Sequence, residues 1–250
     1  MAGHSKWANI KHKKAAVDAK RGVAFTKVVK FIVAAVKKGG SGDPEMNPSL
    51  RLAVEKARAV NMPKDNIDRA IKKATGEDAS VQYEELTYEG YGQGGVAILV
   101  EALTDNRNRT TPEVRKIFEK GGGNLGEMGC VAWMFKRTGM IELDADGKDE
   151  DAWMELAMEA GADDLEIEGD QVIIKTDPES LAEVMDALKE QGLDPKGDLV
   201  SLPETPVVVD DVEQAEKILK LMDTIDDHDD VQSVTSSMEM SEAVRASLEG

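Results

Sequence analysis

The residues of this chain whose types and spacing could do chemistry gather near its start, and they indicate the binding of a polyanion. Six basic residues crowd positions 6–21, with Trp7 and His12 among them: Lys6, Lys11, Lys13, Lys14, Lys20 and Arg21. Lysines neutralise phosphates and release counterions, and an indole can stack on an exposed base. The sequence therefore predicts a basic arm that binds nucleic acid. The alternative is a solvated tail that Trp7 pins to the rest of the protein.

A second group of lysines follows a helical period. With successive residues about 100° apart, Phe25 and Ile32 fall on one face of a helix, and Lys27 and Lys30 fall on the opposite face. We expect the apolar stripe to be buried and the lysine ridge to face solvent. Lys27 and Lys30, together with Lys64 at the start of a later helix, join the predicted nucleic-acid-binding residues.

Two arginines lie where a predicted strand, Val96 to Thr104, passes into a predicted helix, Thr110 to Lys120. Arg107 and Arg109 stand on the loop between these elements. The free N–H groups and the macrodipole at a helix N-terminus favour an anion, and arginine binds phosphate through charge-assisted hydrogen bonds. These two residues are a second candidate anion site. Bridges to nearby acidic side chains are the alternative.

Enzyme and metal-site signatures are absent or stand in the wrong context. Gly90, Gly92 and Gly95 match G-x-G-x-x-G, but they precede a predicted strand, whereas a dinucleotide-binding motif follows one. There is no G-x-x-x-x-G-K-[ST] loop, and no C-x-x-C or H-E-x-x-H motif. Cys130 falls in an apolar segment, 130–135, predicted to be a buried strand. We expect no enzyme, no catalytic residue, no metal, no cofactor and no small-molecule substrate.

Charge is divided unevenly along the 250 residues, whose formal net charge is −18. Residues 1–76 carry 17 Lys/Arg against 6 Asp/Glu, and residues 77–250 carry 14 against 43. The first part therefore presents a positive field that attracts a polyanion. The other interpretation is that this basic part docks on the acidic domains of its own chain.

The sequence also indicates a compartment. The single cysteine cannot form an internal disulfide, so nothing requires an oxidising environment. The longest apolar run, residues 31–36, is far shorter than the roughly 18 residues that span a bilayer. The start, MAGHSKW, has no apolar signal region. We expect a cytoplasmic protein without membrane contact.

The hydrophobic pattern predicts an α+β multidomain fold with three domains. Residues 1–80 form the basic domain, with a three-helix bundle over 22–76. Residues 139–204 show the order β-α-β-β-α-β of a ferredoxin-like domain. Residues 81–138 and 205–250 supply a second, discontinuous ferredoxin-like α/β domain, into which the first is inserted. Its predicted strands are 96–104, 130–135, 207–209 and 231–236.

Long segments of the chain resemble the YebC/PmpR family, whose mitochondrial relatives are translational activators of cytochrome oxidase. The matching segments are MAGHSKW…IKHKK, Asp18 with KRG, Phe25-Thr26-Lys27, NMPKDNI…RAIKK at 61–73, TYEGYGQGGVAILVEALTDNRNRT at 87–110, GGNLGEMGCVAWMF at 122–135 and DDVQSV at 229–234. The departures are Val23 where the family has a basic residue, Gln93 where it has proline, and Thr235 where it has tyrosine. Only Val23 weakens a predicted phosphate contact.

The resemblance implies a helical N-terminal domain, two α/β domains and the regulation of gene expression. Members of the family are described as DNA-binding transcriptional regulators, and others resemble ribosome-associated factors that promote translation. No predicted helix is clearly equipped with the Arg, Asn or Gln residues that read base edges, and a lysine ridge contacts the backbone instead. Our hypothesis is therefore a nucleic-acid-binding regulator of transcription with DNA as its target. Ribosomal RNA, and with it the ribosome and translation regulation, is the alternative.

Overall fold

The computed structural model describes residues 21–76, 82–145 and 147–249, and the chain divides into two compact units. The first comprises Met1–Phe135 and Pro203–Gly250, and the second is Lys136–Leu202. The predicted inserted domain, 139–204, covers nearly the same residues as the second unit. The predicted border at residue 80 falls inside the first unit. The α+β class, with three N-terminal helices followed by sheets, is confirmed.

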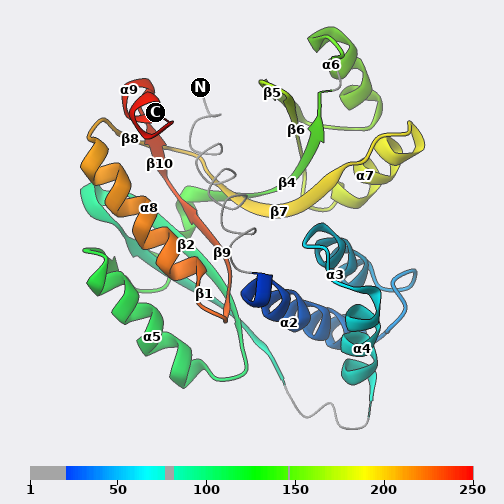
Figure 1. Ribbon diagram of the computed structural model, residues 1–250, viewed down its shortest axis with the longest axis horizontal. Helices are drawn as coiled ribbons and strands as arrows, with labels where there is room; N and C mark the ends of the chain where they lie inside the picture. Colours follow the sequence, from blue (N-terminus) through cyan, green and yellow to red (C-terminus); the bar gives the residue numbers. More distant parts are fainter. Residues whose placement is uncertain (1–20, 77–81, 146, 250) are drawn as a thin grey trace. The chain divides into compact units, whose positions relative to one another are not determined.

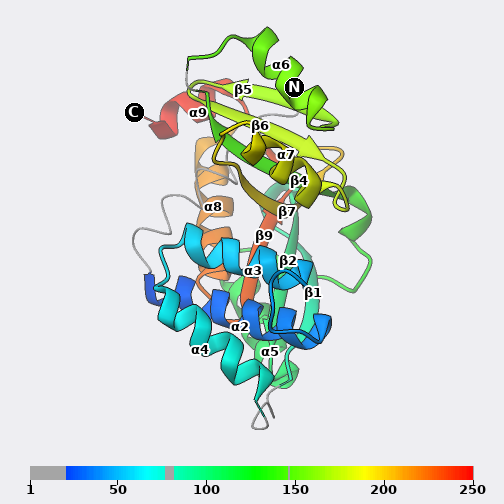
Figure 2. The same ribbon diagram turned by 90° about the vertical axis from the view of Figure 1, so that its right-hand side faces the viewer.

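The first unit begins with three helices that share one apolar core (Figure 2). They are α2 (Arg21–Gly39), α3 (Pro48–Ala59) and α4 (Lys64–Thr75). Ile32 of α2 and Leu50 of α3 are fully buried in this core. Asn47 caps α3 by accepting a hydrogen bond from the Leu50 N–H (3.1 Å), and its side-chain amide donates to the Ala35 carbonyl (2.9 Å). One capping residue thus joins α2 to α3, and the predicted bundle is confirmed.

A four-stranded sheet forms the centre of the first unit. Its strands are β1 (Glu84–Tyr91), β2 (Ala97–Thr104), β3 (Asn124–Leu125) and β9 (Val231–Ser236), in the order β3-β1-β2-β9. β1 and β2 form an antiparallel hairpin, and Gly94 and Gly95 in its connection have positive φ angles of 70° and 75°. β9 pairs antiparallel with β2 at one edge of the sheet, so residues near 231 return to the sheet that begins with β1.

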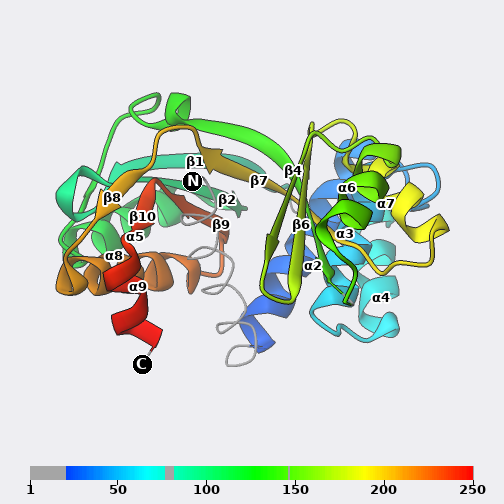
Figure 3. The same cartoon turned by 90° about the horizontal axis from the view of Figure 1, so that it is seen from above.

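Two helices cover one face of this sheet (Figures 1 and 3). They are α5 (Arg107–Lys120) and α8 (Val212–Asp226). Phe118 of α5 and Ile218 of α8 are both buried against the sheet residues Val100 and Val234. Buried apolar surface contributes about 25 cal/mol per Å² to stability. The cluster between α5, α8 and the sheet contains more buried residues than the cluster of the three N-terminal helices, so it is the main core of the unit.

Two of the predicted strands in this unit are wrong in position or partner. Residues 130–135 form a turn and a short 3-10 helix, Ala132–Met134, because the buried Glu89 carboxylate accepts the N–H groups of Gly129, Val131 and Ala132. Those N–H groups are therefore not available to a neighbouring strand. β4 begins only at the end of the segment and is Phe135–Asp144.

The strand β8 (Val207–Val209) is correctly placed in the sequence, but it does not join the large sheet. It pairs in parallel with β10 (Met238–Met240), which precedes the last helix, α9 (Glu242–Glu249). The place that a ferredoxin-like order would give to β8 is taken by β1, because the short glycine-containing connection folds β1 back along β2.

The second unit has the predicted β-α-β-β-α-β order. Its elements are β4, α6 (Glu150–Glu159), β5 (Asp164–Glu168), β6 (Gln171–Thr176), α7 (Leu181–Glu190) and β7 (Lys196–Pro203). The sheet order is β5-β6-β4-β7, which is that of a ferredoxin-like domain. Helices α6 and α7 cover one face of this sheet (Figure 3), and Trp153 of α6 and Leu188 of α7 are fully buried in one apolar core. Among the described residues of the whole chain, no helix has the length and apolarity to cross a membrane.

Candidate nucleic-acid interface

Most of the predicted basic arm falls outside the described part of the structure. This applies to Lys6, Trp7, Lys11, His12, Lys13, Lys14 and Lys20. Arg21 is the first residue of α2, but its side chain is likewise outside the description. Their role in binding stays a prediction.

The lysine ridge of α2 is only partly exposed, because two of its members meet acidic side chains near the end of α8. Lys27 Nζ lies 3.0 Å from the Asp226 carboxylate, and Lys30 Nζ lies 2.5 Å from the Asp230 carboxylate and 2.9 Å from the Asp229 carbonyl. Both lysine side chains are 13% exposed. The expectation of a ridge facing solvent is therefore wrong at these positions. The interpretation that the basic part docks on the chain's own acids describes them better.

Asp230 is the centre of this contact, and its side chain is 1% exposed. Besides Lys30, its carboxylate accepts hydrogen bonds from Arg109 (2.7 Å), Thr110 (2.6 Å) and Thr104 (3.1 Å). Burial alone would raise the pKa of Asp230, but the hydrogen bonds from Lys30, Thr110 and Arg109 outweigh it and hold this pKa well below its usual range. The carboxylate thus links α2, β2 and α5 to the start of β9.

The two arginines lie in the first turn of α5, because this helix begins at Arg107 and not at Thr110. Asn106 is the N-cap and accepts a hydrogen bond from the Arg109 N–H (3.2 Å). Arg107 lies 3.4 Å from Glu84, with both side chains more than half exposed. Arg109 bridges Asp230 at 2.7 Å and Asp105 at 3.2 Å, with 45% of its side chain exposed.

Both arginines therefore meet acids, as the alternative interpretation expected. Since guanidinium has five N–H donors, the exposed part of Arg109 keeps donors that a phosphate could accept. Lys64 is an exposed residue at the first position of α4. The structure gathers Lys30 and Arg109 around one carboxylate, whereas Lys64 lies on the bundle away from that contact.

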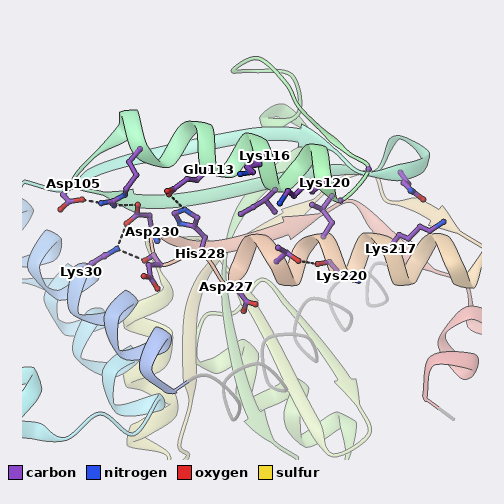
Figure 4. Close-up of a pocket in the computed structure, with 18 residues that line it drawn as sticks. Lys30, Asp105, Glu113, Lys116, Lys120, Lys217, Lys220, Asp227, His228 and Asp230 are labelled. Atoms are coloured by element: carbon purple, nitrogen blue, oxygen red, sulfur yellow. Dashed lines mark hydrogen bonds and ion pairs between the residues drawn. The ribbon is translucent and has the colours of Figure 1, made fainter.

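Sequence reasoning missed a set of basic residues on the face where α5 and α8 run side by side. Lys116 and Lys120 of α5, and Lys217 and Lys220 of α8, line a groove with a volume of about 1230 Å³ (Figure 4). We call it the lysine groove. The signal in the sequence was the i, i+4 and i, i+3 spacing of these lysines, but that spacing does not show that the two helices are neighbours.

Sequence reasoning also missed Glu89, a carboxylate only 3% exposed. Burial raises its pKa, but the three backbone N–H groups of Gly129, Val131 and Ala132 outweigh burial, and the net pKa is lowered. The loop that Glu89 holds carries Trp133, which is 72% exposed and donates its indole N–H to the Cys130 carbonyl (3.2 Å). No strand was predicted at 84–91, so nothing in the sequence singled out Glu89 as a carboxylate that faces inward.

The described residues contain no group of three or more His, Cys, Asp or Glu side chains arranged to hold a metal ion. Cys130 is half-buried in the Glu89 loop, and burial together with the Glu89 charge raises the pKa of its thiol. Its predicted place in a core strand is wrong, because the segment is a turn. The raised pKa disfavours the reactive thiolate.

The fold and its basic surfaces define an α+β protein of several domains, in which a helical bundle precedes a sheet domain that carries an inserted ferredoxin-like unit. A family model described as TACO1/YebC protein N-terminal domain matches residues 5–77, and a model described as TACO1/YebC second and third domain matches residues 83–238. The chain belongs to the TACO1/YebC family, which confirms the resemblance found in its motifs.

Curated relatives match over nearly their whole length. A probable transcriptional regulatory protein of Treponema denticola is 56% identical over 97% of this chain and 98% of its own. One from Syntrophomonas wolfei with the same name is 51% identical over 99% of this chain and 100% of its own. The crystal structure of a conserved hypothetical protein from Aquifex aeolicus has a TM-score of 0.85 and 47% identity, covering 95% of this chain and 98% of that one.

Proposed function

We propose that this protein regulates transcription by binding DNA, and that the contact is made mainly with the phosphate backbone. The observation that carries the proposal is the segregation of charge: residues 1–76 hold 17 basic against 6 acidic side chains in a chain whose net charge is −18. The names of the relatives, probable transcriptional regulatory proteins, support the regulatory role.

The described helices of this basic region add exposed cations to those of the arm. The side chains are Arg58 on α3 and Lys64, Arg69, Lys72 and Lys73 on α4. Flexible lysines on a helical surface suit phosphates better than base edges, because they act as point charges without a fixed donor pattern. The proposal therefore predicts binding that depends strongly on salt and weakly on DNA sequence.

The protein acts in this proposal as a binding protein and not as an enzyme, and it acts in the cytoplasm. The described carboxylates with lowered pKa values, Glu89 and Asp230, are buried and held by backbone N–H groups or by cations and hydroxyls. They are thus committed to the fold, which supports a role in positioning and not in proton transfer.

Fluorescence anisotropy with a labelled DNA duplex, measured on the full chain over a range of salt concentrations, tests the proposal. If about five phosphates are neutralised, log K should fall against log salt with a slope of about −4 to −5. Lys13→Gln/Lys14→Gln should weaken binding and reduce the slope by about 2, whereas the matched variant Lys136→Gln/Lys196→Gln should leave both unchanged.

Two results would overturn the proposal. A slope near zero for the unmodified protein would mean that phosphates do not carry the binding. Tight binding to ribosomal RNA, with co-sedimentation on ribosomes and no measurable affinity for duplex DNA, would replace DNA by the ribosome as the target.

A further inference from the structure

The lysine groove gathers basic side chains in a part of the chain that is otherwise acidic. Residues 77–250 carry only 14 Lys/Arg against 43 Asp/Glu, yet five of those 14 line this groove. They are Arg109, Lys116, Lys120, Lys217 and Lys220. Such a concentration on two facing helices is a feature of the tertiary structure, because the two lysine pairs lie about a hundred residues apart in the sequence.

The acids that line the groove are largely occupied by partners. Asp105 and Asp230 pair with Arg109, and Glu113 lies 2.9 Å from His228. Figure 4 shows Asp105, Asp230 and Lys30 at one end of the groove, whereas Lys116, Lys120, Lys217 and Lys220 lie toward the other end. The two further acids of the lining are Asp227 and Asp229.

Three of the five lysines that line the groove have no such partner, and Lys30 is paired with Asp230. Lys116, Lys120 and Lys220 make no ion pair with another described residue, while Lys217 pairs with the exposed Glu213 at 2.7 Å. Lys116 and Lys120 are one helical turn apart, and like charges at this spacing repel each other. An anion placed between α5 and α8, beside these lysines, would relieve this repulsion.

The floor of the groove is apolar and closely packed. Ile117 and Leu221 contribute to it, and Gly121 lies so close to α8 that a Cβ atom there would stand 2.5 Å from Leu221 Cδ1. The two helices therefore meet at the floor and hold the lysines above it on two sides. A row of phosphates can lie along such a groove and be contacted from both sides.

We propose that the lysine groove binds consecutive phosphates of a nucleic-acid strand and is a second contact surface besides the basic N-terminal region. This inference rests on the proposed function and adds to it a second phosphate-binding site, between α5 and α8. The shared chemistry is a chain of phosphates, which could also come from inorganic polyphosphate, so the experiment distinguishes these two sources. The groove lysines are exposed or lie at the surface of helices, and their replacement by glutamine keeps helix propensity.

The experiment uses the full chain and three double variants. Lys116→Gln/Lys120→Gln and Lys217→Gln/Lys220→Gln each remove two charges from one side of the groove. Arg115→Gln/Lys196→Gln removes two exposed charges that do not line it and serves as the matched control. Affinity for a labelled duplex and for inorganic polyphosphate is measured between about 0.05 and 0.3 M salt, and circular dichroism melting confirms that each variant is folded.

We expect each groove variant to lose about ten-fold or more in affinity at ~0.1 M salt and to show a shallower salt slope, with the control unchanged. If the unmodified protein binds the duplex with a steep salt slope and the groove variants bind it as well as the control variant does, the groove is not a contact surface, while the proposed function stands. Absence of nucleic-acid binding by the unmodified protein would overturn both. Groove variants that lose inorganic polyphosphate but keep the duplex would overturn the assignment to nucleic acid.

Discussion

Replacing the two arginines of α5 one at a time should separate their contribution to folding from their contribution to binding. Arg109 donates to the Asp230 carboxylate at 2.7 Å, and that carboxylate is 1% exposed. Arg107 meets Glu84 at 3.4 Å, and both of these side chains are more than half exposed. The two residues lie in the same helical turn, so Arg107→Ala is a matched control for Arg109→Ala.

The loss of stability expected for each variant follows from the solvent exposure of the ion pair that the variant removes. A hydrogen bond to a charged group contributes about 1.5–3 kcal/mol, and solvent screening at the 45% exposed guanidinium of Arg109 reduces this to about 1–2 kcal/mol. An exposed pair such as Arg107–Glu84 contributes about 0–1 kcal/mol. In a protein of this size, roughly 2–4 °C of melting temperature corresponds to 1 kcal/mol. Arg109→Ala should therefore melt several degrees below Arg107→Ala.

Urea denaturation followed by circular dichroism measures the free energy of unfolding, and anisotropy measures DNA affinity on the same samples. If the exposed face of α5 also contacts phosphate, Arg107→Ala/Arg109→Ala should lose about ten-fold or more in affinity. Equal stability of the two single variants would refute the reasoning about Asp230. A less stable Arg109→Ala with intact binding would show that Arg109 serves the fold and not the interface.

Three other predictions follow from the buried carboxylates and the topology. Asp230→Asn should lower the free energy of unfolding by about 3–5 kcal/mol, because it leaves Lys30 and Arg109 without their buried anion, and equilibrium urea denaturation would detect this. Because folding lowers the pKa of Asp230, its carboxylate contributes to the free energy of unfolding above the unfolded pKa of about 3.9, and this contribution is lost as pH falls below that value. The stability of Asp230→Asn should therefore depend less on acid pH than that of the unmodified protein. The same pH dependence in both proteins would refute this. Glu89→Gln should lower the free energy of unfolding by about 1.5–3 kcal/mol in the same assay, because the neutral amide holds the 129–132 N–H groups less strongly. The fluorescence of Trp133 in that loop should change as well, and unaltered emission would contradict this role of Glu89. Deleting residues 229–250 removes β9, the strand that pairs with β2 and closes one side of the sheet, and should abolish the thermal transition of this unit. A transition at the original temperature would refute the discontinuous topology.

The elements that could be predicted from the sequence are those whose signals are local. The three N-terminal helices have a 3.6-residue period and clear ends, such as Asn47 before α3 and Gly76 after α4. The inserted unit has strong strands and helices in a β-α-β-β-α-β order that leaves few alternative topologies. In both cases neighbouring residues decide the structure.

Predictions failed where a residue far away in the sequence takes part in the local hydrogen bonding. The segment 130–135 looks like a core strand, but Glu89, about forty residues earlier, accepts its N–H groups and makes it a turn. Thr110 stands where the predicted helix begins, but it lies inside the helix that Asn106 caps, and its buried hydroxyl donates to Asp230, 120 residues later. In each case a buried carboxylate takes hydrogen-bond donors that a local pattern would assign elsewhere, and no local pattern reveals the partner.

The candidate interface could be predicted only in part. Lysines on the polar face of a helix give one sequence pattern whether they face phosphates or the chain's own carboxylates. Lys27 and Lys30 meet carboxylates, so an external polyanion would have to compete with a buried Asp230 for the latter. The lysine groove has the opposite character, because most of its lysines have no anionic partner among the described residues. Lysines without partners can neutralise a phosphate without first breaking an ion pair, so the groove and the exposed cations of α3 and α4 are better candidates for backbone contacts than the ridge of α2.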